Sequence, residues 1–396
     1  MNYSFAQRVS SLKPSAIREI LKFTSAPGYI PFAAGNPSPE AFPTTIISEI
    51  SNNILTNRPI DALQYSITEG YAPLRDHLTN YMKTKHDIGR DFDQILICSG
   101  AQQVMNLATM ALCDPGDVII CENPSFIGSL NAFRCMEQKL VGVDMEEDGM
   151  NLEMLEKCIK ENPSCKFIYT IPNFQNPSGI TMSLEKRKKL YRLAKENNIL
   201  ILEDNPYGDI RIGGENLPSI KSFDQDGIVI YAGTFSKVLA PGIRVGYAIA
   251  PRQIISKMVV CKQTSDVHTN IWGQLLCHEF MTKYDYEAHL ENNRNIYREK
   301  ANHMLDLLDK YIGGRISFTR PEGGLFIWCT LPDSVDMLDF CKALLDKKVA
   351  VVPGNAFTMK DTDKTQSFRI NFSTPTNEQL ELGCKILGET ADIFIK

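Results

Sequence analysis

The sequence predicts an α/β protein whose mostly parallel sheet is covered by helices on both sides. Short apolar runs recur between residues 94 and 231, and amphipathic stretches separate them. The runs are short, rich in β-branched residues and apolar at consecutive positions, as expected for strands buried on both faces. The predicted strands are Gln94–Cys98, Val118–Cys121, Lys166–Thr170, Ile199–Leu202 and Ile228–Tyr231.

Helical patterns lie between these runs, at Ala101–Leu112, Leu152–Lys160 and Leu184–Asn197. Strands that alternate with helices indicate a parallel sheet. In such sheets, ligands bind beyond the carboxyl ends of the strands. The polar segments that follow the apolar runs are therefore the places to search for functional residues.

The flanking regions predict a second, smaller α+β unit. A short helical pattern at Ser15–Ser25 precedes the Gly/Pro-punctuated segment Ile30–Pro39, and a strand is expected at Arg244–Ile249. The remaining predicted elements are helices across Asn270–Tyr311, strands at Phe326–Trp328, Val349–Val352 and Ser367–Phe372, and a closing helix near Glu378–Thr390. We expect an N-terminal segment (1–45) that packs with the small domain, a large domain (46–285) and a small C-terminal domain (286–396).

Charge and hydropathy exclude several classes of function. The net charge is -5, and the nearest approach to a basic block, Glu185–Lys189, has the composition of a solvated helix face, so we expect no nucleic-acid partner. No window holds the roughly 18 apolar residues that a membrane span needs, and the first residues do not form a signal sequence. We expect a cytoplasmic protein without membrane contact.

The cysteine and histidine patterns favour neither disulfides nor a metal site. The 11 cysteines include no Cys-x-x-Cys pair, and several lie inside apolar runs, as Cys98 and Cys121 do. Histidines such as His268 and His278 have no partners at ligand spacing. The expectation is buried, reduced thiols and no bound metal.

Polar groups follow each of the first two predicted strands. Ser99–Gln103 opens a helix, and free N–H groups with the helix dipole form an anion site there, although an ordinary strand-to-helix turn would also need its glycine. Glu122–Phe126 places an aromatic ring at the rim of the sheet, where it either stacks on a flat ligand or packs within the protein.

The next two strand ends carry an amide and a carboxylate. Asn176 can donate to a phenolate oxygen, or it makes an Asx turn before Pro177. Asp204 follows a buried strand, where a carboxylate needs a cation or donors; a pyridinium N–H would suit it, and a helix cap is the structural alternative. Tyr207 lies three residues beyond, where it also has the character of a residue that fills a turn.

The segment after the last of these strands combines a lysine with phosphate-binding groups. Thr234, Ser236, Lys237 and Arg244 stand within one turn-rich loop. A lysine can form an imine with an aldehyde, and the hydroxyls with the arginine can hold a phosphate, so pyridoxal phosphate would use both. Alone, a lysine after a strand is more commonly a solvated surface charge.

Taken together, these segments resemble the class I/II aminotransferase family, the fold-type I enzymes that use pyridoxal 5'-phosphate (PLP). The similar segments are Ser99–Gln103, Asn176–Gly179, Glu203–Tyr207, Thr234–Lys237 with Arg244, and Phe368–Ile370. Within the family the chain is most similar to the aminoadipate and kynurenine aminotransferases and the MocR-like regulators, through Leu63–Ser66, Glu122–Phe126 and Gly323–Trp328. The resemblance implies a large domain with a mostly parallel seven-stranded sheet and a smaller α+β domain.

The resemblance also implies a role for individual residues. Lys237 would hold PLP as an internal aldimine and then move the proton, Asp204 would pair with the ring nitrogen, and Phe126 would lie over the ring. The phosphate would be held by Gly100, Ala101, Gln102, Thr234, Ser236 and Arg244, with Tyr65 reaching in from a neighbouring subunit. Asn176 and Tyr207 would bind the phenolic oxygen, and Arg369 would bind the α-carboxylate of the substrate. We also expect Asn176 and Gly35 to contact the substrate, because a residue as small as Gly35 lets the backbone approach a ligand, although a plain connecting loop would equally explain this glycine. Many relatives have tyrosine where this chain has Phe126, so a hydroxyl contact is missing here.

The implied function is an aminotransferase that moves the amino group of an L-amino acid to a 2-oxo acid, with 2-oxoglutarate as the expected acceptor, in a homodimer with shared active sites. A lyase or decarboxylase on the same fold is an alternative, because fold and cofactor do not fix the reaction. A ligand-sensing regulator domain is another, but about thirty residues precede Phe32–Gly35, too few for a DNA-binding domain. The sequence does not identify the side chain that is recognised.

Overall fold

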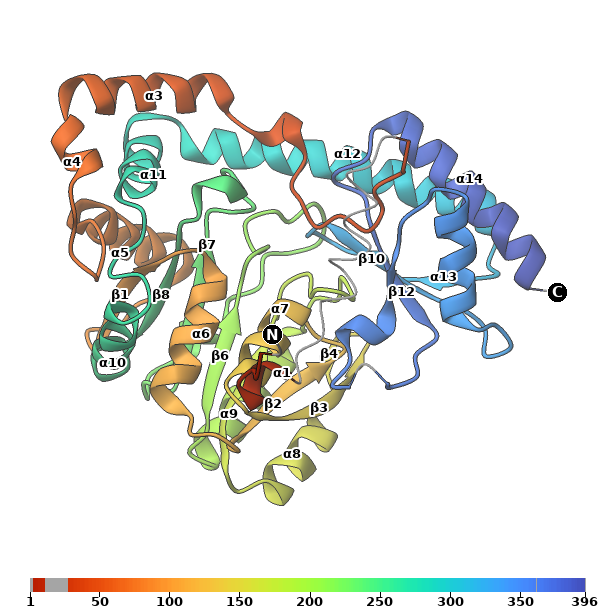
Figure 1. Ribbon diagram of the computed structural model, residues 1–396, viewed down its shortest axis with the longest axis horizontal. Helices are drawn as coiled ribbons and strands as arrows, with labels where there is room; N and C mark the ends of the chain where they lie inside the picture. Colours follow the sequence, from red (N-terminus) through yellow and green to blue (C-terminus); the bar gives the residue numbers. More distant parts are fainter. Residues whose placement is uncertain (1–2, 11–27, 361, 396) are drawn as a thin grey trace.

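The predicted apolar runs form strands of one large sheet (Figure 1). The computed structural model describes residues 3–10, 28–360 and 362–395. The sheet has eight strands in the order β1-β8-β7-β6-β5-β2-β3-β4. Their bounds are β1 Asp93–Cys98, β2 Val118–Asn123, β3 Lys139–Glu146, β4 Gly149–Met150, β5 Cys165–Thr170, β6 Leu200–Asp204, β7 Val229–Thr234 and β8 Gly246–Pro251.

The prediction of a mostly parallel sheet is confirmed. Strands β3, β2, β5, β6 and β7 pair in parallel, while β8 runs antiparallel between β7 and β1. The expected count of seven is one short, because the two-residue β4 adds an antiparallel edge beside β3. Strand β3 was not predicted because it is partly exposed: it begins with Lys139, and Asp144 interrupts its apolar residues.

Each face of the sheet packs against its own hydrophobic cluster, because successive side chains of a strand point to opposite faces. In β5, Phe167 and Tyr169 join the cluster that contains α6 and α7, whereas Ile168 joins the cluster under α8 and α9. Both faces of the sheet are therefore buried against apolar side chains, and this explains why the strands are apolar at consecutive positions.

The helices agree with the sequence where the apolar spacing is regular. Helix α6 has the predicted bounds, and α8 and α9 differ from theirs by one residue at the C-terminal end, whereas several helices, among them α7, α10 and α13, had no predicted bounds. The α-helices are α1 Gln7–Ser10, α3 Thr44–Asn57, α4 Pro59–Leu63, α5 Ala72–His86, α6 Ala101–Leu112, α7 Ile127–Cys135, α8 Leu152–Glu161, α9 Leu184–Glu196, α10 Arg252–Gln263, α11 Ile271–Lys283, α12 Tyr286–Ile312, α13 Met337–Asp346 and α14 Asn377–Phe394. Short 3-10 turns are η1 Pro39–Ala41, η2 Ile220–Phe223, η3 Pro241–Ile243 and η4 Gly354–Phe357.

A second, antiparallel sheet lies beside the first, and the long α12 runs along both (Figure 1). Its strands, in spatial order, are β11 Val352–Pro353, β12 Ser367–Asn371, β10 Phe326–Thr330 and β9 Ser317–Phe318. The predicted strand at 349–352 is mostly wrong: Val349 makes only an isolated parallel bridge to Ile30, and β11 begins at Val352. The helical pattern predicted at 15–25 lies outside the described residues, and the domain boundaries stay a prediction.

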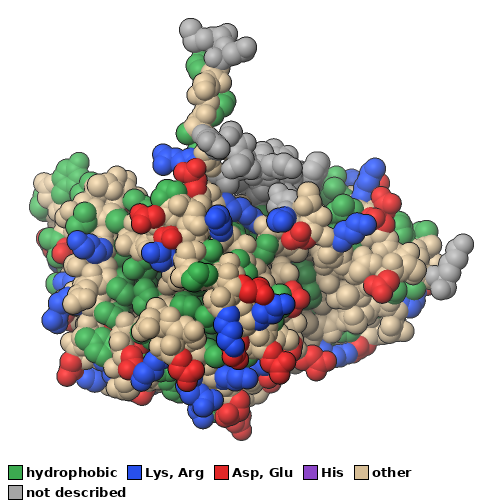
Figure 2. All heavy atoms as spheres, turned by 90° about the horizontal axis from the view of Figure 1, so that it is seen from below, with side chains coloured by type: hydrophobic (Ala, Val, Ile, Leu, Met, Phe, Trp, Pro, Cys, Tyr) green, Lys and Arg blue, Asp and Glu red, His purple; other side chains and the backbone are tan. Residues whose placement is uncertain are grey.

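The surface carries charges of both signs. On the face shown in Figure 2, Lys and Arg side chains are interspersed with Asp and Glu. All eleven cysteines are free thiols, most of them buried. Among the described residues, no helix combines the length and apolar character of a membrane span.

Candidate active site

The polar segments at the strand ends meet around one cavity of about 470 Å³. The large sheet contributes the loops after β5, β6 and β7, and the small sheet contributes β10 and β12. Of the residues predicted for the site, all except Gly100 and Tyr65 line this cavity. The predicted residues that line the cavity are Gly35, Ala101, Gln102, Phe126, Asn176, Asp204, Tyr207, Thr234, Ser236, Lys237, Arg244 and Arg369.

Lys237 lies in the loop after β7 with its amine directed into the cavity. Its Nζ donates to the carbonyl oxygen of Gly35 at 2.8 Å and lies 6.0 Å from the centre of the Tyr207 ring. Burial, together with the nearby cations Arg369 and Arg244, lowers the pKa of Lys237 to about 8. A substantial fraction of this amine is neutral, and so nucleophilic, near pH 8.

Asp204, the last residue of β6, uses only one of its carboxylate oxygens in hydrogen bonds to the described residues. Its Oδ2 accepts from the Tyr169 hydroxyl at 2.8 Å, and that hydroxyl accepts from Ser129 Oγ at 2.8 Å. Oδ1 is buried and has no hydrogen-bond partner among the described residues. Burial raises the pKa of Asp204 to about 7. A buried acceptor of this kind costs free energy unless a donor meets it, and a pyridinium N–H supplies such a donor.

Sequence reasoning missed Tyr169 and Ser129. Tyr169 is fully buried inside the apolar run of β5, where it reads as a packing aromatic. The sequence did offer a signal for this contact, because Tyr169 brings a hydroxyl into a strand that is buried on both faces. A buried tyrosine usually finds a hydrogen-bond partner. Here that partner is the carboxylate of Asp204.

The start of α6 and the loop after β7 form a cup for an anion. Arg244 Nη2 donates to the carbonyl of Ser99 at 3.1 Å, and Thr234 Oγ1 donates to Ser236 Oγ at 3.0 Å. The first N–H groups of α6, which begins at Ala101, have no partners within the helix. Gly100 has φ +81°, and a Cβ there would lie 2.4 Å from Arg244 Nη2, so the cup admits only glycine without rearrangement.

Two further predicted residues lie beside the cup. The Gln102 side chain donates through Nε2 to the carbonyl of Gly128 at 2.9 Å, so its amide is already engaged with α7. Phe126 precedes α7 and lines the cavity, and a Cβ on Gly128 would lie 2.6 Å from its ring. Gly128 thus leaves room for the Phe126 ring at the edge of the cavity.

Arg369 is a buried cation at the other end of the cavity. Its Nη1 donates to Asn176 Oδ1 at 2.9 Å and its Nη2 to the carbonyl of Ala33 at 3.0 Å, while the buried Nε has no partner among the described residues. The guanidinium lies 4.1 Å from the Phe326 ring centre and 5.1 Å from that of Phe357. Burial lowers its pKa only to about 10, so Arg369 stays charged at neutral pH and can hold a carboxylate.

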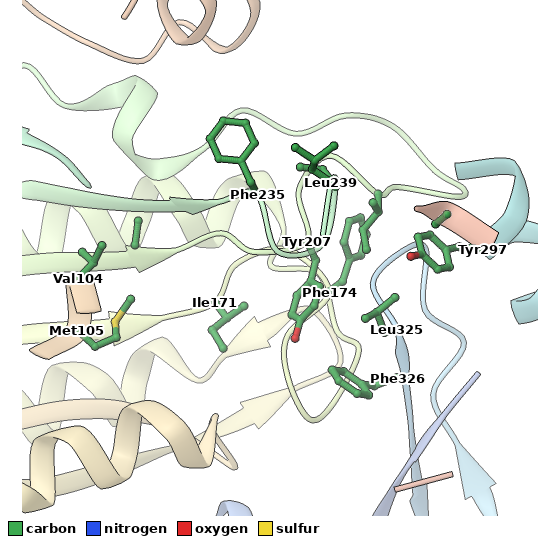
Figure 3. Close-up of a cluster of buried hydrophobic side chains, with 14 of the residues drawn as sticks. Val104, Met105, Ile171, Phe174, Tyr207, Phe235, Leu239, Tyr297, Leu325 and Phe326 are labelled. Carbon is green, nitrogen blue, oxygen red and sulfur yellow. The ribbon is translucent and has the colours of Figure 1, made fainter. Parts of the chain in front are cut away.

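Tyr207 joins the two ends of the cavity. Asn176 Nδ2 faces the Tyr207 hydroxyl at 3.5 Å, and the Tyr207 ring meets the Phe326 ring edge-on at 5.9 Å between centres. Figure 3 shows these two rings, from the loop after β6 and from β10, with Ile171 nearby. The apolar side of the cavity is therefore built by both sheets.

Tyr65 lies elsewhere in this chain. Its side chain is 82 % exposed and borders a separate surface groove with Leu63, His268 and Trp272. Its expected contact with the site of a neighbouring subunit stays a prediction.

The residues of the cavity suit PLP. The unpaired Asp204 Oδ1, the anion cup at Gly100 and the neutralisable amine of Lys237 match its ring nitrogen, phosphate and aldehyde.

Comparisons with known proteins agree with this geometry. A family model described as aminotransferase class I and II matches residues 27–387. The chain is 37 % identical to aromatic-amino-acid aminotransferase 1 of Thermococcus litoralis, over 98 % of this chain and 93 % of that protein. It is 36 % identical to the 2-aminoadipate transaminase of Thermus thermophilus, over 97 % of this chain and 96 % of that one. The solved structure of Pyrococcus horikoshii kynurenine aminotransferase, in complex with PMP, superposes with a TM-score of 0.95 at 36 % identity, covering 99 % and 98 % of the two chains.

Proposed function

Because the chain belongs to the class I and II aminotransferase family and is a PLP-dependent aminotransferase, we propose that its amino donors are L-amino acids with large apolar or aromatic side chains. One observation carries the proposal: the cavity lining includes the apolar residues Ala33, Ile127 and Phe326, and Arg369 contacts Ala33 and Phe326 directly. Among the described lining residues the cations are Lys237, Arg244 and Arg369, and each already has a role in the proposed site.

The proposed roles follow from where each group lies. Arg369 holds the α-carboxylate of the substrate through its fork of donors. Lys237, freed as a neutral amine, takes the α-proton and later returns a proton. Asp204 holds the ring nitrogen protonated, and the cup at Gly100 holds the phosphate. When bound, PLP supplies an electron-withdrawing ring that lowers the barrier to removal of the α-proton.

We propose 2-oxoglutarate as the amino acceptor on the basis of the family resemblance. Its α-carboxylate and 2-oxo group have the same arrangement as those of the keto acid that leaves, so Arg369 and Lys237 would serve both half-reactions. The second carboxylate of 2-oxoglutarate would meet the same apolar wall as the side chain of aspartate, so the acceptor is proposed from the family resemblance and not from this wall.

We also propose that two copies associate through the face that carries Tyr65. Ile60, Leu63 and Tyr65 are 71 %, 74 % and 82 % exposed, and Trp272 is 41 % exposed beside them. Exposed apolar residues grouped in this way mark interaction surfaces. A second copy that covered this face would bring the loop containing Tyr65 to a neighbouring active site.

A half-reaction panel tests the donor. Purified PLP-loaded protein is mixed with single L-amino acids, and conversion is followed by the loss of the visible absorbance of the bound cofactor. We expect kcat/KM for phenylalanine and leucine to exceed that for aspartate by at least about tenfold, because an unpaired buried carboxylate costs more than about 1.4 kcal/mol. Equal or faster reaction with aspartate would contradict the proposal.

A control variant and a test of the acceptor complete the panel. Lys237→Ala should abolish conversion of every donor, so any loss of absorbance that remains in this variant comes from slow exchange of the cofactor. The acceptor is tested by adding 2-oxoglutarate, pyruvate or phenylpyruvate to the aminated protein and following the return of the visible band. Failure of 2-oxoglutarate to restore that band would exclude it as the acceptor.

A further inference from the structure

Lys262, in the last turn of α10, is a fully buried cation outside the cavity. Its Nζ donates to Gln103 Oε1 at 2.6 Å, to Asp266 Oδ1 at 2.8 Å and to Thr269 Oγ1 at 2.9 Å. All three protons of the ammonium group therefore have acceptors. Burying a charge is costly even when it is paired, so the position of this group calls for an explanation beyond stability.

On one side, the acceptors of Lys262 hold the anion cup. Gln103 Oε1 also accepts from the backbone N–H of Ser99 at 2.8 Å, and Asp266 Oδ2 accepts from Ser99 Oγ at 2.7 Å. The carbonyl of Ser99 accepts from Arg244. Ser99 is thus fixed through its N–H, its hydroxyl and its carbonyl, and it directly precedes the Gly100 turn of the cup.

On the other side, the network reaches the loop that carries Tyr65. The carbonyl of Thr269 accepts from His268 Nδ1 at 2.9 Å, and His268 Nε2 accepts from the backbone N–H of Ser66 at 3.3 Å. These two contacts require one tautomer, with the proton on Nδ1. The Tyr65 and His268 rings also meet edge-on, at 5.9 Å between centres.

We propose that Lys262 is a positioning residue that holds the anion cup and the Tyr65 loop in one fixed arrangement. It acts through Ser99 and Thr269 and does not touch the cofactor. The inference rests on the proposed role of the cup in binding the phosphate of PLP. Without the ammonium group, Gln103 and Asp266 lose the cation between them, and the Ser99 turn and residues 264–269 are held together less tightly, through the hydrogen bonds of Ser99 Oγ to Asp266 and Thr269.

Lys221 provides a matched control. It is also fully buried, and its Nζ donates at 2.8 Å to Asp93 Oδ1, to Asp224 Oδ2 and to the carbonyl of Val229. Unlike Gln103 and Asp266, none of these partners forms a hydrogen bond with Ser99. Lys262→Met and Lys221→Met each remove a fully buried lysine that donates three hydrogen bonds, so a purely structural role predicts the same effect of both variants on cofactor binding.

The experiment measures cofactor binding without donor or acceptor. Equilibrium dialysis gives the Kd of PLP, and thermal unfolding gives Tm with and without PLP. We expect both variants to lower the Tm of the cofactor-free protein, but only Lys262→Met to raise the Kd, by about tenfold or more, and to shrink the rise in Tm on adding PLP. A Kd within about twofold of wild type for Lys262→Met, or an equal rise for Lys221→Met, would overturn the proposal.

Further variants keep the test decisive. If Lys262→Met does not fold, Asp266→Asn, at a partly exposed position of the same network, should weaken PLP binding in the same direction, and an unchanged Kd would overturn the inference. Arg244→Gln tests the cup itself: weakened binding in Arg244→Gln with none in the Lys262 variant rejects this inference alone, whereas unchanged binding in Arg244→Gln rejects the role of the cup.

Amide hydrogen exchange tests whether Lys262 also holds the loop that carries Tyr65. In the cofactor-free protein, Lys262→Met should accelerate exchange in residues 63–69, where the Ser66 N–H is held by His268, and Lys221→Met should not. Unchanged exchange in this segment would show that Lys262 does not hold the Tyr65 loop.

Discussion

Replacing Arg369 by glutamine should remove most of the selectivity for amino acids over amines. The guanidinium has two donors engaged, with Asn176 and Ala33, and a buried Nε without a partner among the described residues. A carboxylate that met this fork would form two charge-assisted hydrogen bonds of about 1.5–3 kcal/mol each. Together they are worth about 3–6 kcal/mol, so kcat/KM for phenylalanine should fall by about 10²- to 10⁴-fold.

A matched substrate separates this effect from damage to the fold. 2-Phenylethylamine is phenylalanine without its carboxylate, so its slow reaction should change little in Arg369→Gln. The assay is the single half-reaction, followed by the visible absorbance of the bound cofactor under both substrates. If kcat/KM fell by the same factor for both, Arg369 would not be the carboxylate site and the reasoning would be refuted.

A second buried arginine provides the control variant. Arg211 also lies over an aromatic ring, with its guanidinium 4.7 Å from the centre of Phe174, and pairs with Glu322, but it does not line the cavity. Arg211→Gln should lower the stability and leave the ratio of kcat/KM for the two substrates unchanged.

Removal of the Arg369 charge should also raise the pKa of Lys237, because Arg369 is, after burial, the largest cause of the lowered pKa of that amine.

Three other predictions concern the cofactor. Because burial lowers the pKa of Lys237 to about 8 and only a neutral amine attacks an aldehyde, capture of PLP by the cofactor-free protein should accelerate as pH rises through 8; a stopped-flow series with a flat profile would contradict this. Gly100→Ala should weaken PLP binding about tenfold and cost about 1–3 kcal/mol of stability, since its Cβ would lie 2.4 Å from Arg244 Nη2 at a positive φ; dialysis and thermal unfolding measure both. Asp204→Asn should lower kcat about 10- to 100-fold, the value of one charge-assisted hydrogen bond of about 1.5–3 kcal/mol; a kcat equal to wild type in steady-state assays would argue against contact with the ring nitrogen.

Local signals were enough for most of the large sheet. Strands such as β5 and β7 are apolar at consecutive positions because both of their faces are covered, and this pattern is visible in one dimension. Strands β3 and β9 were missed and β11 was misplaced, because β3 is partly exposed and β9 and β11 are only two residues long. Their pairing depends on strands that are distant in sequence, so no local periodic pattern of apolar residues predicts them.

The hydrogen-bond partners of the site residues were beyond the sequence. Tyr169 contacts Asp204 across a sequence separation of 35 residues, and Lys262 contacts Gln103 across 159. A buried tyrosine and a helical lysine have ordinary explanations when read singly. Only the folded chain shows that each reaches a residue of the site.

The sequence by itself determined the type of fold, the family and the groups that face the cavity, because strand ends in a parallel sheet converge and carry their polar residues with them. Tertiary structure decided what those groups can do. Packing lowers the pKa of Lys237, leaves Asp204 Oδ1 without a partner in the described part of the chain, and places Arg369 beside two aromatic rings. These properties come from burial and from contacts between distant segments, and such contacts exist only once the chain has folded.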